Sequence, residues 1–108
     1  MPAFAITSEH VDGGVLIALT GELDDDAASF VTVEVRRHVH RYDRGQVTFD
    51  CSRITTVSPR GAAGLADAVR PLSGPGRPVL LSPPTLLLAS LGDLGRGDLF
   101  QVETPQAA

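Results

Sequence analysis

The sequence predicts a single α/β domain that is built on a mixed β-sheet. Apolar segments of strand length alternate with helical segments in the order β-β-α-β-α-β-α-β. From the second strand onward, each strand is joined to the next by a helix, which is the connection that parallel strands require. We therefore expect about five strands with parallel members, right-handed crossovers and roughly three to four helices.

The predicted strands are short apolar segments between turn residues. The first strand turns at Asp12-Gly13-Gly14, and the second closes at Gly21. The third ends at Asp50, and a second short apolar segment with Ile54 and Val57 follows it. A turn over residues 43–45 precedes this third strand. In chain order, the strands span residues 4–9, 15–20, 46–50, 79–81 and 99–102.

The first predicted helix, residues 24–40, has two competing periodicities. Every second residue from Val31 to Val35 is a valine, as in a strand. Valines also recur every four residues from Val31 to Val39, as on one face of a helix. Aspartates at the start and arginines and histidines at the end match the dipole of a helix, so we predict a helix here.

Two further helices are marked by their boundary residues. The second, residues 60–72, ends at the breaker Ser73-Gly74-Pro75-Gly76. The third starts at Pro83-Pro84, runs to Leu91 and stops at Gly92. We expect the domain to span residues 1–103 and the tail from residue 104 to be mobile.

Composition limits the class of protein. The chain has 108 residues, 43% of them hydrophobic, which fits one globular domain. We expect no secretion signal, and the sequence has no run of about 18 apolar residues that could span a membrane. A single cysteine, Cys51, excludes an internal disulfide and fits a reducing compartment. The cytoplasm is the expected location.

The net charge of −4 includes nine arginines and no lysine. We attribute the missing lysine to the codon bias of a GC-rich genome. The arginines form one cluster, at residues 36, 37, 41 and 44, which a helix C-terminus explains better than a nucleic-acid groove does. We expect no direct contact with nucleic acid and none with a membrane.

Residues that could carry catalysis or bind a metal are scattered. His38 and His40 lie two positions apart on a helix, so their rings diverge, and His10 is isolated. Cys51 follows a buried strand, so a packed thiol is a better interpretation than a nucleophile. No glycine-rich phosphate loop is present. We expect no enzyme activity, no metal and no cofactor.

The most informative segment runs from Gln46 to Leu65 and contains the start of the second helix, Ser58-Pro59-Arg60-Gly61. A serine before a proline marks a helix start, because its hydroxyl can accept from an unpaired amide of the first turn. A helix start at the end of a strand also presents backbone donors to a partner. Gly61 and Gly64 lie three positions apart, which indicates a close approach of this helix to the sheet.

Four blocks of the chain resemble the STAS domain, the fold of bacterial anti-sigma-factor antagonists, and together they cover nearly its whole length. No block is specific alone, but their order and spacing are. They are Gly21-Glu22-Leu23-Asp24, Asp50-Cys51-Ser52-Arg53-Ile54, the pair Gly61 and Leu65, and the C-terminal set Leu80-Leu81-Ser82-Pro83, Leu87-Leu88, Leu91 and Leu99-Phe100.

The resemblance implies partner switching. Such a protein, when unphosphorylated, binds an anti-sigma factor that is a serine kinase and thereby frees a sigma factor. The kinase phosphorylates a serine or threonine at the start of the second helix, which breaks the complex. A weak homodimer is also compatible with the resemblance.

This sequence departs from the family pattern at the acceptor position. The family pattern is aspartate, serine, serine or threonine, glycine. In this chain Arg60 occupies the position of the phosphate acceptor, and Ser58 stands in place of the aspartate. Arg60 cannot take a phosphate. Ser58 is expected to be an N-cap, with a phosphosite as the second choice, and Asp24 to be a cap, with a partner contact as the second choice.

The partner-binding residues predicted from this pattern lie around the second helix start: Asp24, Ser58, Pro59, Arg60 and Ala62. Arg60 is either a solvated residue of the first turn or the anchor of a charged contact. Two other functions stay open: a STAS domain that binds a nucleotide or a lipid, and a scaffold subunit that does not switch.

Overall fold

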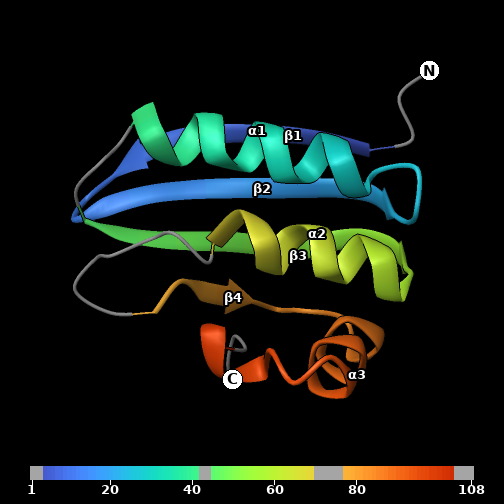
Figure 1. Cartoon of the computed structure of the whole chain (residues 1–108). Helices are drawn as coiled ribbons and strands as arrows, with labels where there is room; N and C mark the ends of the chain where they lie inside the picture. The colour runs from blue at the N-terminus through green and yellow to red at the C-terminus, as the bar shows by residue number, and fades with distance from the viewer. Residues whose placement is uncertain (1–3, 42–44, 70–76, 104–108) are drawn as a thin grey trace.

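The protein is a five-stranded sheet with helices packed on it (Figure 1). This computed structural model describes residues 4–41, 45–69 and 77–103. The strands lie in the sheet in chain order; the first pair is antiparallel and the other pairs are parallel, which confirms the predicted mixed sheet. They are β1 (Phe4–Val11), β2 (Gly14–Leu23), β3 (Gln46–Val57), β4 (Val79–Leu81) and β5 (Gln101–Glu103).

Three α-helices connect the parallel strands: α1 (Ala28–Arg41), α2 (Pro59–Val69) and α3 (Thr85–Asp93). Helices α1 and α2 lie side by side over one face of the sheet, and α3 packs beside α2 (Figure 1). The core fills the space between this helix pair and the sheet. Its fully buried side chains include Ile17 of β2, Phe49 of β3, Val35 of α1 and Leu65 of α2. Among the described residues, no helix is long and apolar enough to cross a membrane.

Strand β3 is longer than predicted, because it continues past Asp50 to Val57. Beyond Asp50 its buried residues, Cys51 and Ile54, lie three positions apart, so the two-residue period of a strand is broken. The pairing with β2 shifts register twice in this part, once beside Gly21, whose φ is 106°. Such bulges insert extra residues into one strand and hide it from an analysis of periodicity.

Helix α1 begins at Ala28 rather than at Asp24. Residues 24–27 form a turn in which the Ala27 amide donates to the Asp24 backbone oxygen at 3.1 Å and to its Oδ1 at 3.0 Å. The aspartates therefore precede the helix instead of occupying its first turn.

The third helix was predicted to stop at Gly92, but it continues to Asp93. Gly95 ends it, with a φ of 70°, and its amide donates to the Gly92 oxygen at 3.0 Å while the Arg96 amide donates to the Leu91 oxygen at 2.9 Å. This pair of bonds is a Schellman motif, which needs the left-handed residue after the helix rather than within it.

The last strand is also displaced, because Leu99 belongs to a 3-10 turn, Gly97–Leu99, and the strand starts at Gln101. Helix α2 begins at Pro59, one residue before the predicted start. Its predicted end at residues 70–72, the breaker at 73–76, turn residues 43 and 44 and the tail from 104 lie outside the described residues.

Candidate functional site

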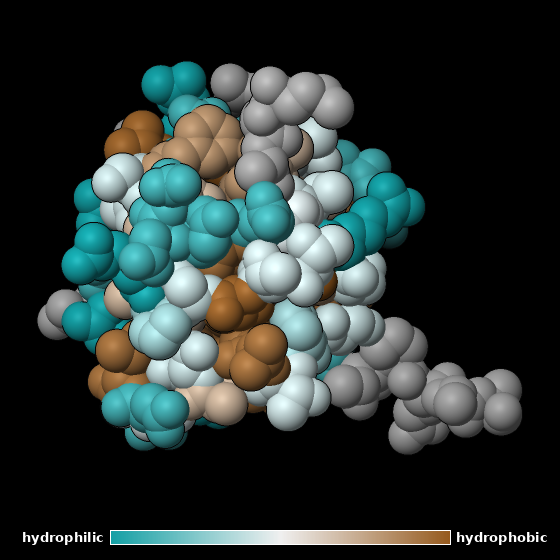
Figure 2. Space-filling view, turned by 90° about the vertical axis from the view of Figure 1, so that its right-hand side faces the viewer, coloured by the Kyte–Doolittle hydropathy of each residue, from teal (hydrophilic) through white to brown (hydrophobic). Residues whose placement is uncertain are grey.

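The three helices begin at the same end of the molecule. Strands β2, β3 and β4 are parallel, so the connections that follow them leave from one edge of the sheet, on the right in Figure 1. Figure 2 looks at this end and shows hydrophilic and hydrophobic residues interspersed, with hydrophobic surface gathered in its lower half. Because a protein–protein interface is about as apolar as the rest of a protein surface, individual residues rather than this composition indicate the site.

Ser58 caps helix α2, as predicted. Its Oγ accepts from the Gly61 amide at 3.1 Å, and its backbone oxygen accepts from the Ala62 amide at 2.9 Å. Its own amide donates to the Leu23 oxygen at 2.9 Å, which ties the start of α2 to the end of β2. Pro59 is the first helical residue, where its missing N–H has no partner to lose.

Asp25, which the sequence pattern did not single out, also belongs to this site. The Ser58 hydroxyl donates to Oδ1 of Asp25 at 2.6 Å, across 33 positions of the chain. Asp24 lies beside the start of α2, since a Cβ on Gly61 would come within 3.1 Å of its backbone nitrogen. Its carboxylate accepts the Ala27 amide, which is the capping role expected first, while its contact with a partner stays a prediction. The run of aspartates was visible in the sequence, but only the fold shows which of them meets Ser58.

Pro59 and Arg60 are exposed, as a contact surface requires. Arg60 makes no hydrogen bond or ion pair with any residue that the structure describes. Ala62 does not belong to this surface, because its side chain is fully buried at 0% exposure, so its predicted role in partner binding is wrong. The half-buried Ala63 takes its place on the outer side of α2.

The two helix glycines permit close approaches of α2, but to different elements. A Cβ on Gly61 would collide with the Leu23 carbonyl at the end of β2, which confirms the predicted approach to the sheet. A Cβ on Gly64 would lie 2.6 Å from the backbone oxygen of Ala28, so Gly64 serves the approach to α1 rather than to the sheet.

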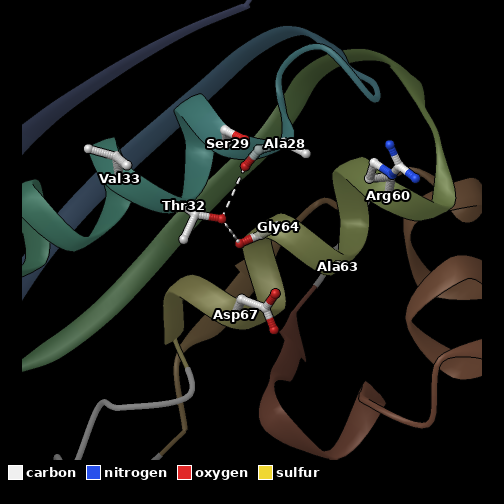
Figure 3. A pocket seen from close by; sticks show the side chains of 8 residues that line it. All are labelled: Ala28, Ser29, Thr32, Val33, Arg60, Ala63, Gly64 and Asp67. Carbon is white, nitrogen blue, oxygen red and sulfur yellow. Dashed lines mark hydrogen bonds between the residues drawn. The ribbon is translucent and has the colours of Figure 1, made fainter.

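A groove of about 390 Å³ runs between α1 and α2 (Figure 3). At its floor, the Thr32 hydroxyl lies 2.8 Å from the Gly64 oxygen and 3.0 Å from the Ala28 oxygen, so it bridges the two helices. Arg60 lies toward one end of the groove and Asp67 toward the other. The lining residues are Ala28, Ser29, Thr32, Val33, Arg60, Ala63, Gly64 and Asp67.

Two side chains on β3 have shifted pKa values. Burial, with a smaller effect from Asp50, raises the pKa of the Cys51 thiol to about 12, so the packed thiol predicted from the sequence is confirmed. The pKa of Asp50 is lowered because its carboxylate accepts from the Ser52 hydroxyl at 2.7 Å and from the Ser52 amide at 3.0 Å, with help from the charge of Arg53.

Histidines do not converge on a site within the part of the chain that the structure describes. A 2.6 Å hydrogen bond between the His38 Nδ1 and the Ser8 hydroxyl links α1 to β1. No group of three or more metal-binding side chains occurs within residues 4–41, 45–69 and 77–103.

The fold is the STAS fold that the sequence resemblance implies. It is shared with the solved structure of the anti-sigma factor antagonist SpoIIAA in its unphosphorylated form, with a TM-score of 0.61 and 22% identity over 93% of this chain and 89% of that one. The phosphorylated form of SpoIIAA, a Bacillus cell fate determinant, gives a TM-score of 0.63 and 20% identity over 93% and 92%. Comparison with family models and with curated proteins returned no match.

Proposed function

We propose that this chain is a regulatory binding protein that acts as an anti-sigma factor antagonist. It binds an anti-sigma factor of the serine-kinase type and thereby frees a sigma factor, without catalysing a reaction itself. The shared fold with SpoIIAA, an anti-sigma factor antagonist known in phosphorylated and unphosphorylated forms, supports this kind of partner.

The observation that carries the proposal is the exposed Arg60 at the start of α2, which forms no hydrogen bond or ion pair with any described residue. Arg60 is solvated in the free chain, and it can form charge-assisted hydrogen bonds when a partner supplies an acid. A cation in the first turn is also slightly unfavourable against the helix dipole, by about 0.3–1 kcal/mol. A binding role accounts for that cost.

The same position removes the family's phosphorylation switch. Arg60 has no hydroxyl to accept a phosphate. The neighbouring Ser58 has its hydroxyl in bonds to Asp25 and to the Gly61 amide. A phosphate on Ser58 would place two negative charges against the Asp25 carboxylate, which opposes the modification. We therefore propose a partner complex that ATP does not dissolve.

The groove favours a protein partner over a nucleotide or a lipid. Small-molecule sites enclose most of the surface of their ligand. Here Ser29, Val33 and Arg60, which line the groove, are exposed. An open groove of this kind is better suited to a surface element of another protein.

Sigma-factor release tests the proposal. Purified complexes of a serine-kinase anti-sigma factor with its sigma factor, taken from the same genome, are titrated with this chain, and free sigma factor is followed by gel filtration. Wild type is expected to release sigma factor in proportion to its concentration, and Arg60→Glu to require roughly tenfold more. If none of the complexes releases sigma factor, the proposed function is wrong.

A further inference from the structure

We propose that the groove between α1 and α2 receives a short amphipathic helix of the partner. This inference rests on the proposed function and names the structure that would fill the site. A carboxylate on the partner helix pairs with Arg60, and its aliphatic side chains pack on Val33 and Ala63. The groove, the exposed valine and the distribution of charge support it independently.

The walls of the groove favour a helix as the occupant. Both walls are α-helices, whose backbone groups are already paired within the helix, except at the ends. At the floor, the Gly64 oxygen is also bonded to the Thr32 hydroxyl. Only the end beside Arg60, where Ala28, Ser29 and Arg60 belong to first helical turns, has amides without a partner within the helix. Along the rest of the groove an extended segment would find almost no backbone partners, whereas a helix satisfies its own.

The size of the groove matches about two turns of such a helix. Arg60 and Asp67, which bound it on α2, are seven positions apart, or roughly 10 Å at 1.5 Å per residue. Between them the lining residues of α2 are small: Gly64 lies against Thr32 and Ala28 of α1, and Ala63 is its neighbour on α2 (Figure 3). Small side chains on the walls allow another helix to approach closely.

Val33 is an exposed apolar side chain that does not pack in the core. It is 56% exposed, whereas Val31 and Val35 on the same helix are fully buried. Figure 3 shows its side chain on the outer side of α1, at the edge of the groove. Phe30, three positions earlier, is 45% exposed and extends this apolar surface toward β1, where its ring meets Phe4.

The charges distinguish the two ends of the groove. At one end of the groove Arg60 has no counter-ion among the described residues. At the other end the Asp67 carboxylate is paired with Arg96 at 2.6 Å, and the Asp67 backbone oxygen accepts from Arg36 at 3.1 Å. The partner therefore needs an acid at the Arg60 end and no cation at the Asp67 end.

The test uses the purified anti-sigma factor kinase and two groove variants. Val33→Ser removes the apolar anchor on an exposed position, and Ala63→Phe fills the groove. Matched controls are Val102→Ser on β5 and Ala89→Phe on α3, which change an exposed valine and an exposed alanine outside the groove. Both groove variants are expected to weaken binding of the kinase by roughly tenfold, and both controls to leave it unchanged.

A charge exchange tests the pairing of Arg60. Each exposed acid of the kinase is changed to arginine in turn and is combined with Arg60→Glu. One such combination is expected to restore most of the affinity that Arg60→Glu loses, and cross-linking from position 33 should reach the same kinase helix.

The outcomes separate this inference from the proposed function. If the kinase binds wild type and both groove variants equally, the groove is not the docking site, while the proposed function stands. The proposed function also stands, but the helix as occupant is wrong, if the kinase residue that restores affinity to Arg60→Glu lies in an extended segment. If wild type binds no anti-sigma factor kinase, the proposed function and this inference are both overturned.

Discussion

The hydroxyl of Ser58 donates a 2.6 Å hydrogen bond to the Asp25 carboxylate, between the turn before α1 and the start of α2. The same oxygen accepts from the Gly61 amide at 3.1 Å. One hydroxyl therefore fixes a helix start and joins two segments that are 33 positions apart. Arg60, two residues after Ser58, is positioned relative to α1 by this contact.

Ser58→Ala is expected to lower the free energy of unfolding by about 1 kcal/mol, the usual loss for an N-cap. Asp25→Ala should lower it by less, because it removes one exposed bond and leaves the cap in place. Urea unfolding followed by circular dichroism measures both. An unchanged stability of Ser58→Ala would mean that the hydroxyl does not cap α2 in solution.

The order of elements follows from the sequence because each segment carries its own periodicity and boundary residues. The exceptions have local physical causes. Strand β3 was predicted too short because its bulges separate the buried Cys51 and Ile54 by three positions. The end of α3 was misplaced because Gly92 is tolerated within a helix, and only the left-handed backbone at Gly95 distinguishes the true stop.

Gly64→Ala is expected to destabilise the protein, because its Cβ would meet the Ala28 backbone at 2.6 Å. Overpacking of this kind costs about 1–3 kcal/mol, which exceeds the roughly 0.5–1 kcal/mol that alanine gains over glycine in a helix.

Gly92→Ala is the matched control, since a Cβ there meets nothing within 4 Å. It should stabilise α3 by about 0.5–1 kcal/mol. Thermal unfolding of both variants measures the difference. Equal effects of the two substitutions would contradict the close packing of α1 on α2.

Cys51 should make stability fall at alkaline pH. The thiol ionises near its ordinary pKa of 9.0 in the unfolded chain but only at about 12 in the folded protein. Above pH 9 the unfolded state therefore binds fewer protons than the folded state, and the free energy of unfolding decreases as pH rises toward 12.

The comparison is between wild type and Cys51→Ala, with stability measured by urea unfolding at several pH values from neutral to alkaline. Wild type should lose stability more steeply, and its thiol should resist alkylation until the chain unfolds. Identical slopes together with rapid alkylation of the folded protein would show that Cys51 is accessible.

The site was predictable in part. The helix start around Ser58 and the exposure of Arg60 follow from local sequence signals. Asp25 was not predictable, because three consecutive aspartates are alike in sequence and the fold selects one of them. The burial of Ala62 could have been predicted, since it lies three positions before the core residue Leu65 and on the same face of α2.

Arg60→Glu is expected to leave the thermal midpoint nearly unchanged, because Arg60 is exposed and has no bond to another described residue. Binding of the anti-sigma factor kinase should weaken by roughly tenfold, or about 1.4 kcal/mol, and less so at high salt. Thermal unfolding gives the midpoint, and titration calorimetry at two salt concentrations gives the loss of affinity and its dependence on salt. Equal affinities of variant and wild type would show that Arg60 is solvated in the complex.

Binding that phosphorylation does not switch off is the central feature of the proposed function. The most direct measurement is the affinity of the chain for the kinase before and after incubation with ATP, with the intact mass of the chain recorded in the same samples. We expect an unchanged mass and an unchanged affinity. A gain of one phosphate on Ser58 together with loss of the complex would contradict this and would indicate a displaced switch.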